Sequence, residues 1–305
     1  MAREFPFKLA AVDLDDTLLG PDKNVATPNR EALERLRSLG CEVVLASGRR
    51  HENMLPFCRG LGLDGFVVSC QGAATRHART GQFLHHAPLD PLSAAEVTRS
   101  GLERRVTVMY WSSQGVCASE RSPWVQRYEA DCNDPVPVAD VNEVLHRPAE
   151  KVIWAAEPPF IASLAPHLRR RYEGRLNVIV TDDWFLEFSS IGATKAAGVA
   201  AVARARGVPQ ERVLAFGDGN NDVAMLEWAG MGVAMSHARP AAKAAAKMVA
   251  PDGDAETSFA RAVEGVLKAS IGGGGGHRTP PSSRRDLRDT GVVAARWTGP
   301  VGLPL

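Results

Sequence analysis

Short apolar runs alternate with amphipathic segments along most of this chain. Several of the runs have the length of a buried parallel strand and are bounded by polar or turn residues. They lie at residues 9–12, 42–46, 65–69 and 213–216. The segment from about Pro28 to Leu39 carries apolar residues at helical spacing and stops before Gly40, so it predicts a helix. Strands that alternate with helices indicate an α/β fold with a parallel sheet.

The alternation of predicted strands and helices is interrupted in the middle of the chain. Residues 74–88 predict a hairpin, and residues 90–188 mix helices with antiparallel strand pairs. After these residues the alternation of strands and helices resumes. The sequence therefore predicts a Rossmann-like core with an inserted α+β domain. We expect the core at residues 1–82 and 190–270 and the inserted domain at residues 83–189.

The last segment, residues 271–305, has a different composition. After Ile271 it contains the glycine run Gly272–Gly276 and continues with a stretch that is rich in proline, serine and arginine and poor in apolar residues. Such a segment cannot bury enough apolar surface to offset the entropy lost on ordering. We expect a disordered tail here.

Composition and charge exclude several classes of partner and site. The formal net charge of +1 gives no reason to expect nucleic acid as the main partner. No stretch reaches the length of a membrane-spanning helix, and the N-terminus enters the first strand without a signal-peptide apolar region. The five cysteines form no Cys-x-x-Cys pair and show no zinc spacing. We therefore expect a cytoplasmic protein, a monomer or homodimer, that binds neither membrane nor nucleic acid.

Two aspartate clusters directly follow two of the predicted strands. The first is Asp13-Leu14-Asp15-Asp16-Thr17 after residues 9–12, and the second is Gly217–Asp222 after residues 213–216. Parallel strands end together at the carboxyl edge of an α/β sheet, where these folds bind their ligands. Carboxylates packed this closely repel one another unless a cation neutralises them, and an all-oxygen cluster suits Mg²⁺. The pattern predicts a magnesium-assisted site with an aspartate nucleophile.

With two further segments, these clusters resemble the motifs of a known superfamily. In chain order the segments are Asp13-x-Asp15-x-Thr17, Ser47-Gly48-Arg49, Lys195 and Gly217-Asp218-Gly219-Asn220-Asn221-Asp222. This order resembles the four motifs of the haloacid dehalogenase superfamily, and the inserted domain is similar to the larger cap of its Cof-type phosphatases. The resemblance covers residues 8 to about 268. It implies a Mg²⁺-dependent phosphatase that acts on a small phosphorylated metabolite, with a sugar phosphate or similar compound as the expected substrate.

The resemblance and the chemistry of each residue type suggest the same catalytic roles. Asp13 would attack phosphorus and form an aspartyl-phosphate, which splits one difficult displacement into two easier ones. Asp15 would protonate the leaving oxygen and then activate water for the second step. Lys195 would be the cation that joins the nucleophile to the transferring phosphoryl group.

The same resemblance suggests how a metal would be held. We expect Mg²⁺ to be bound by Asp13, Asp218 and the backbone carbonyl of Asp15. Thr17 and Asp222 are expected in support, with Asp222 acting on the metal or on Lys195.

Four residues are expected at the phosphate of the substrate: Ser47, Gly48, Arg49 and Asn221. Ser47 and the N–H of Gly48 stand between a strand end and a helix start, which suits a phosphate oxygen. Two roles stay open for Arg49, a substrate contact and a solvent-facing side chain. Gln71 and His237 stand where the family often has asparagine, so their contact with substrate stays open as well.

Two alternatives remain from the sequence. One is a phosphosugar mutase of similar architecture, and the other is a non-catalytic binding or regulatory protein on the same fold. A mutase would need basic cap residues that retain a bisphosphate, and the candidate Arg169-Arg170-Arg171 lies on a predicted helix, where consecutive residues cannot all face one site. The non-catalytic alternative would fit the loss of a motif residue, and the four motifs are complete.

Overall fold

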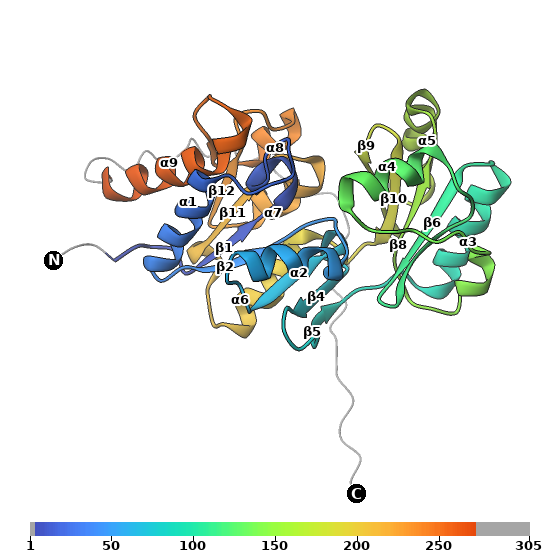
Figure 1. Cartoon of the computed structure of the whole chain (residues 1–305), viewed down its shortest axis with the longest axis horizontal. Helices are drawn as coiled ribbons and strands as arrows, with labels where there is room; N and C mark the ends of the chain where they lie inside the picture. The colour runs from blue at the N-terminus through green and yellow to red at the C-terminus, as the bar shows by residue number, and fades with distance from the viewer. Residues whose placement is uncertain (1–3, 273–305) are drawn as a thin grey trace, which may run out of the picture. The chain divides into compact units, whose positions relative to one another are not determined.

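A computed structural model describes residues 4–272 of the chain, and its central element is a sheet of five parallel strands (Figure 1). The strand order is β13–β12–β11–β1–β2, so β1 lies at the centre between β11 and β2. The strands are β1 (Leu9–Val12), β2 (Glu42–Leu45), β11 (Val213–Gly217), β12 (Met231–Ala234) and β13 (Met248–Val249). The predicted parallel α/β core is confirmed.

Helices connect these strands and pack on the sheet. They are α1 (Thr27–Ser38), α2 (His51–Gly60), α6 (Lys195–Ala205), α7 (Val223–Trp228), α8 (Pro240–Ala245) and α9 (Ser258–Gly272). Buried apolar side chains from residues 5–68 and 199–266 form one continuous cluster. The blue and orange segments of Figure 1 therefore share one core although most of the chain separates them in sequence.

The strand after α2 begins a second, smaller sheet. The three antiparallel strands are β3 (Phe66–Ser69), β4 (Ala74–His77) and β5 (Phe83–His86). A parallel bridge between Ala46 and Val68 joins β3 to the end of β2. The predicted hairpin at residues 74–88 is present. Because β5 pairs with β4, this sheet extends into the range 83–189 assigned to the inserted domain, and the domain boundaries stay a prediction.

The middle of the chain forms a five-stranded antiparallel sheet in the order β7–β6–β8–β10–β9. Its strands are β6 (Thr107–Ser112), β7 (Gly115–Ala118), β8 (Ala149–Ala155), β9 (Leu176–Asp182) and β10 (Phe185–Ser190). Its helices are α3 (Pro91–Glu103), α4 (Pro123–Cys132) and α5 (Pro158–Arg171). Each helix begins at proline, whose fixed φ and missing N–H suit the first helical turn. A separate cluster of buried apolar residues from 89 to 188 fills this unit, which we call the cap.

A third apolar cluster lies where the core and the cap meet. It combines Cys70 and Ala73, which follow β3, with Met109, Trp111 and Ile153 of the cap sheet. The loop after β3 therefore packs against both units.

All five cysteines are unpaired. None of the helices among residues 4–272 is long and apolar enough to cross a bilayer. Helix α9 continues to Gly272, and the rest of the predicted tail lies outside the described residues.

The loop after β3 also fixes the start of α6. Cys70, Gln71 and Gly72 have φ values of 50°, 59° and 93°, so three successive residues adopt the left-handed region. A Cβ atom on Gly72 would lie 2.0 Å from the carbonyl oxygen of Thr194, the residue that caps α6. Only glycine permits this approach, and the approach sets the position of the helix.

We expect Gly72→Ala to lower the free energy of unfolding by more than about 3 kcal/mol, because left-handed strain adds to a backbone clash. Gly174 offers a matched control, since its φ is +71° and a Cβ there would meet nothing within 4 Å. Gly174→Ala should lose about 1 kcal/mol through strain alone. Urea denaturation of both variants measures the difference, and equal losses would show that the Thr194 contact is unimportant.

Candidate active site

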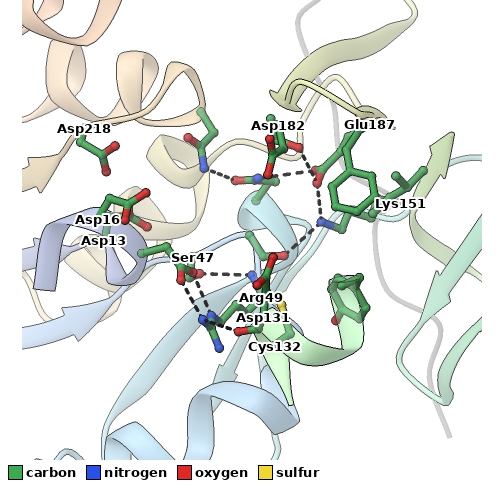
Figure 2. A pocket seen from close by; sticks show the side chains of 18 of the residues that line it. Asp13, Asp16, Ser47, Arg49, Asp131, Cys132, Lys151, Asp182, Glu187 and Asp218 are labelled. Carbon is green, nitrogen blue, oxygen red and sulfur yellow. Dashed lines mark hydrogen bonds and ion pairs between the residues drawn. The ribbon is translucent and has the colours of Figure 1, made fainter. Parts of the chain in front are cut away.

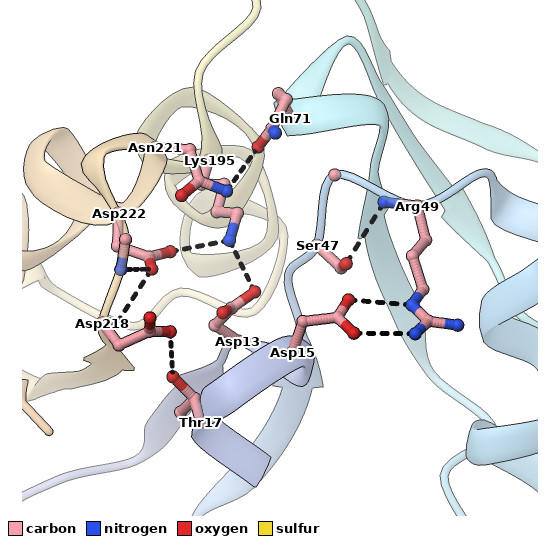
Figure 3. A network of polar contacts seen from close by, with 12 residues as sticks. Asp13, Asp15, Thr17, Ser47, Arg49, Gln71, Lys195, Asp218, Asn221 and Asp222 are labelled. Atoms are coloured by element: carbon pink, nitrogen blue, oxygen red, sulfur yellow. Dashed lines mark hydrogen bonds and ion pairs between the residues drawn. The ribbon is translucent and has the colours of Figure 1, made fainter. Parts of the chain in front are cut away.

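The topology of the core sheet brings the predicted motifs to one edge. In the register of the sheet, Val12 pairs with Phe216 on one side and with Leu45 on the other. Asp13 therefore leaves the centre of the sheet beside the loop that carries Asp218, and beside the segment that leads to Ser47 (Figure 3). The two aspartate clusters are therefore in contact in the fold, although about 200 residues separate them in sequence.

The segment after Asp13 turns back on itself within one irregular helical turn, Leu14–Leu18. Asp16 has φ 57°, a value that asparagine and aspartate tolerate better than most residues. This turn brings the Thr17 hydroxyl to the second aspartate cluster, where it donates a hydrogen bond to Asp218 Oδ1 at 2.9 Å. The two predicted strand-end loops are thus joined directly.

Lys195 is the first residue of α6 and is only 1% exposed. Its Nζ lies 2.6 Å from Asp13 Oδ1 and 2.6 Å from Asp222 Oδ1 (Figure 3). Burial alone would lower the pKa of Lys195, but the two carboxylates reverse this and raise the pKa above its ordinary value. Lys195 is therefore a permanent positive charge at the centre of the site.

Asp222 is completely buried and its two oxygens are both engaged. Oδ1 accepts from Lys195, and Oδ2 accepts from the backbone N–H groups of Asp218 and Gly219 at 3.0 and 2.9 Å. The loop passes so close that a Cβ atom on Gly217 would lie 2.5 Å from the Asp222 carboxyl carbon. Asp222 thus fixes both the acidic loop and the lysine.

Asp13, Asp218 and Asp222 form a carboxylate cluster in which one oxygen from each residue lies within 4.8 Å of the other two. Burial and the charge of Asp222 raise the pKa of Asp13 well above its usual range. Burial and Asp222 also raise the pKa of Asp218 to about 6. Within residues 4–272, no hydrogen bond engages the second oxygen of Asp13 or of Asp218. Two under-neutralised carboxylates with a free oxygen each fit a hard divalent cation.

Asp15 lies outside this cluster because its side chain pairs with Arg49. The guanidinium donates two hydrogen bonds, from Nε to Oδ2 at 2.8 Å and from Nη2 to Oδ1 at 2.7 Å. Lys23 adds a third contact at 3.3 Å. Burial would raise the pKa of Asp15, but the bonds from Arg49 lower it overall. Arg49 is only 6% exposed, so the solvent-facing alternative for this residue is wrong.

The residues expected at the phosphate lie around the same pocket. Ser47 is buried, and its Oγ accepts from the Arg49 backbone N–H at 3.2 Å. Gly48 lies against Gln71, because a Cβ atom there would be 2.5 Å from the Gln71 amide nitrogen. Asn221 donates a hydrogen bond to Gln71 Oε1 at 3.0 Å. Contact of these residues with a phosphate group stays a prediction.

His237 lies on the exposed side of the first acidic loop. Its Nε2 is 2.6 Å from the backbone carbonyl oxygen of Asp16. It is not among the residues that line the pocket, whereas Gln71 is. Of the two departures from the family pattern, Gln71 is therefore the one that faces the pocket.

The pocket has a volume of about 240 Å³ and extends from the acidic edge of the core to the cap. Figure 2 shows Asp13, Asp16 and Asp218 at one end and Lys151, Asp182 and Glu187 at the other. The three cap residues were not predicted from the sequence. Both strands carry a signal that could have found two of them. Glu187 is the one charged residue of its strand and has buried neighbours, and Lys151 lies beside Glu150 in a strand that is buried throughout.

Comparisons with known proteins agree with this geometry. The model of the haloacid dehalogenase-like hydrolase family matches residues 10–263. HMP-PP phosphatase of Citrobacter koseri is 25% identical over 233 residues, with 76% of this chain and 85% of that protein covered. Pyridoxal phosphate phosphatase YbhA of Escherichia coli is 27% identical over 255 residues, with 80% and 93% covered. The crystal structure of a haloacid dehalogenase-like hydrolase from Bacteroides thetaiotaomicron has a TM-score of 0.75 at 26% identity, with 85% and 99% covered.

The carboxylate cluster predicts a pH-dependent stability. The pKa of Asp218 is about 6 in the fold and 3.8 ordinarily, so its folded state favours the protonated form. The stabilisation that Asp218 gives to the fold is fully present below pH 3.8 and is lost as the pH rises through about 6. This loss lowers the free energy of unfolding by about 2–3 kcal/mol. In chelator, Asp218→Asn should therefore raise Tm at pH 7.5 and change it little at pH 4.

Thermal unfolding at the two pH values measures this effect. Asp252→Asn removes the same charge from an exposed position and should show no gain that depends on pH. A loss of stability in Asp218→Asn at pH 7.5 would contradict the idea that the cluster is strained without a cation.

Proposed function

This chain belongs to the haloacid dehalogenase-like hydrolase family, and we propose that it hydrolyses a small phosphorylated metabolite through an aspartyl-phosphate on Asp13. The family resemblance seen in the sequence is thereby confirmed, and the chain is a phosphatase. The observation that carries the proposed mechanism is the pair of contacts from the buried Lys195 to Asp13 and Asp222.

Asp13 attacks phosphorus in the proposed mechanism. Lys195 holds one carboxylate oxygen, and the other is left without a hydrogen bond among the described residues, on a pocket-lining side chain. As the bond from this oxygen to phosphorus forms, the bond from phosphorus to the leaving oxygen breaks. Lys195 keeps its position throughout and offsets the negative charge of Asp13 and of the phosphoryl oxygens.

Asp15 supplies the proton transfers. It gives a proton to the leaving oxygen in the first step and takes one from water in the second, when water attacks the aspartyl-phosphate. In this structure the Arg49 contacts favour the charged form of Asp15, which is the form needed for the second step. A substrate phosphate that draws Arg49 towards itself would allow Asp15 to hold a proton for the first step. Burial and a place on the pocket lining support grouping Arg49 with the phosphate-binding residues.

We propose that Asp13, Asp218 and the backbone carbonyl of Asp15 hold Mg²⁺. The free oxygen of Asp218 and the raised pKa values of both carboxyl groups support this choice. When bound, Mg²⁺ would neutralise charge on the phosphoryl oxygens. Thr17 orients Asp218, and Asp222 orients Lys195 while both of its own oxygens are occupied.

Ser47, Gly48 and Asn221 complete the proposed phosphate site from three different segments of the core. The names of the two relatives support a small phosphorylated metabolite as substrate, since one is an HMP-PP phosphatase and the other a pyridoxal phosphate phosphatase. Five unpaired cysteines support a reducing, cytoplasmic setting. The oligomeric state and the exclusion of nucleic acid and membrane stay predictions.

We expect Asp13→Asn to abolish hydrolysis of p-nitrophenyl phosphate while leaving the fold intact, because the amide keeps the shape and loses the nucleophile. The expected loss in kcat is more than about 10⁴-fold. Steady-state kinetics and circular dichroism measure the two properties. Retention of more than about a hundredth of the wild-type kcat would rule out Asp13 as the nucleophile.

Chelation should silence the enzyme and Mg²⁺ should restore it. Ca²⁺ should inhibit, because it prefers more ligands and longer bonds than Mg²⁺. Mg²⁺ should also raise Tm in the wild type and not in Asp218→Asn, which gives a readout besides activity. Full activity in excess chelator would refute the proposed metal site.

A further inference from the structure

The cap half of the pocket has an unusual charge balance. Its charged lining residues are Asp131, Asp182 and Glu187 on the negative side and Lys151 on the positive side (Figure 2). Among the described residues that line this half, Lys151 is the sole cation. An incoming negative group on the substrate would therefore depend on Lys151 for compensation.

Lys151 is not available for that purpose. It lies on β8, is 2% exposed, and directs its Nζ to Glu187 Oε1 at 2.9 Å and to the carbonyl oxygen of Gly48 at 3.1 Å. The same nitrogen lies 3.9 Å from the centroid of the Trp111 ring. An ammonium group has three donors, and these three contacts use them. Because the pair with Glu187 is buried, breaking it for a substrate anion is costly.

Glu187 and Asp182 offer acceptors instead. Glu187 Oε1 receives Lys151 and the Thr181 hydroxyl, but Oε2 receives only a long contact of 3.5 Å from Gln71 Nε2. Asp182 accepts from the Asp183 backbone N–H and forms no ion pair within 4 Å among the described residues. Both side chains can therefore accept hydrogen bonds from a hydroxyl or ammonium group of the substrate.

The other cations near the pocket belong to the core or are already paired. Arg49 and Lys23 contact Asp15. Arg239 is exposed and comes from the core, where its backbone N–H donates to the carbonyl oxygen of Asp218. Arg127, which does not line the pocket, lies 3.5 Å above the Trp184 ring and pairs with Asp131 at 3.7 Å.

We propose that the cap selects phosphate esters whose leaving group offers hydrogen-bond donors and carries no second negative charge. Glu187 and Asp182 would accept from the donors, and the saturated Lys151 would leave a carboxylate or second phosphate uncompensated. This inference rests on the proposed phosphatase function and narrows its substrate class. It also disfavours the mutase alternative, because the second phosphate of a bisphosphate would lie against the carboxylates of Glu187 and Asp182.

The test compares three small esters as competitors of p-nitrophenyl phosphate hydrolysis in Mg²⁺: phosphoethanolamine, glycerol 3-phosphate and 3-phosphoglycerate. Their leaving groups carry a cation, hydroxyls only, and a carboxylate. The first two should compete at least about tenfold more strongly than 3-phosphoglycerate, because like charges brought together at a binding site are costly. Equal competition by the three, including no competition by any, would overturn the proposal.

Glu187→Gln tests the residue that carries the selectivity. It frees Lys151 from its carboxylate, so the preference for glycerol 3-phosphate over 3-phosphoglycerate should fall by at least about fivefold. Asp182→Asn, at a half-exposed position, should lower the preference as well and covers the case in which Glu187→Gln does not fold. Glu173→Gln removes the same charge from an exposed cap residue and should leave the ratio unchanged.

Hydrolysis of p-nitrophenyl phosphate distinguishes a failure of the proposed phosphatase function from a failure of the proposed charge selection. Absence of p-nitrophenyl phosphate hydrolysis by the wild type would count against the proposed function itself. Hydrolysis with no discrimination among the three esters, or with an unchanged ratio in both Glu187→Gln and Asp182→Asn, would count against the charge selection alone.

Discussion

The site depends on one interaction, the buried contact of Lys195 with Asp13 and Asp222. Two carboxylates and one ammonium leave a negative excess in a region that water barely reaches. Removing the lysine would leave two uncompensated buried charges, and breaking a buried pair typically costs about 3–5 kcal/mol. This negative excess, together with burial, raises the pKa values of Asp13 and Asp218. The carboxylate cluster therefore keeps a negative excess that a divalent cation would neutralise.

Backbone geometry makes this interaction possible. Lys195 reaches the sheet edge because α6 starts against the loop of Gly72, where the helix cap and the glycine are in contact. Asp222 reaches Lys195 because Gly217 leaves room for its carboxyl group. Side chains at either glycine would push apart the groups that have to meet. These glycines therefore serve the chemistry although neither carries a functional group.

The fold and the location of the site were predictable, because each depends on local patterns. Apolar runs of strand length mark β1, β2 and β11, and the residues that follow such strands must meet at one sheet edge. The pairing of Asp15 with Arg49 was not predictable, since it depends on how an irregular turn aims one side chain at another 34 residues away. The ion pair of Lys151 with Glu187 was missed for the same reason. Their strands are neither adjacent in sequence nor distinguished by turn signals, and only the sheet register of the cap brings them together.

The missed pair also joins the cap to the chemistry. Asn221 of the acidic loop donates to Gln71, whose amide nitrogen faces Glu187, and Glu187 binds Lys151, which contacts the carbonyl oxygen of Gly48. This polar chain leaves the core at one proposed phosphate residue and returns to it at another. Because Gln71 is longer than the asparagine expected at its position, it can bridge the loop and the cap. A leaving group that displaces the long contact between Gln71 and Glu187 would therefore also shift the Gln71 amide that accepts from Asn221. In the proposed site, Gln71 and Lys151 would thus connect the residue that recognises the leaving group with those that place the phosphate, so a substrate of the wrong charge would disturb both.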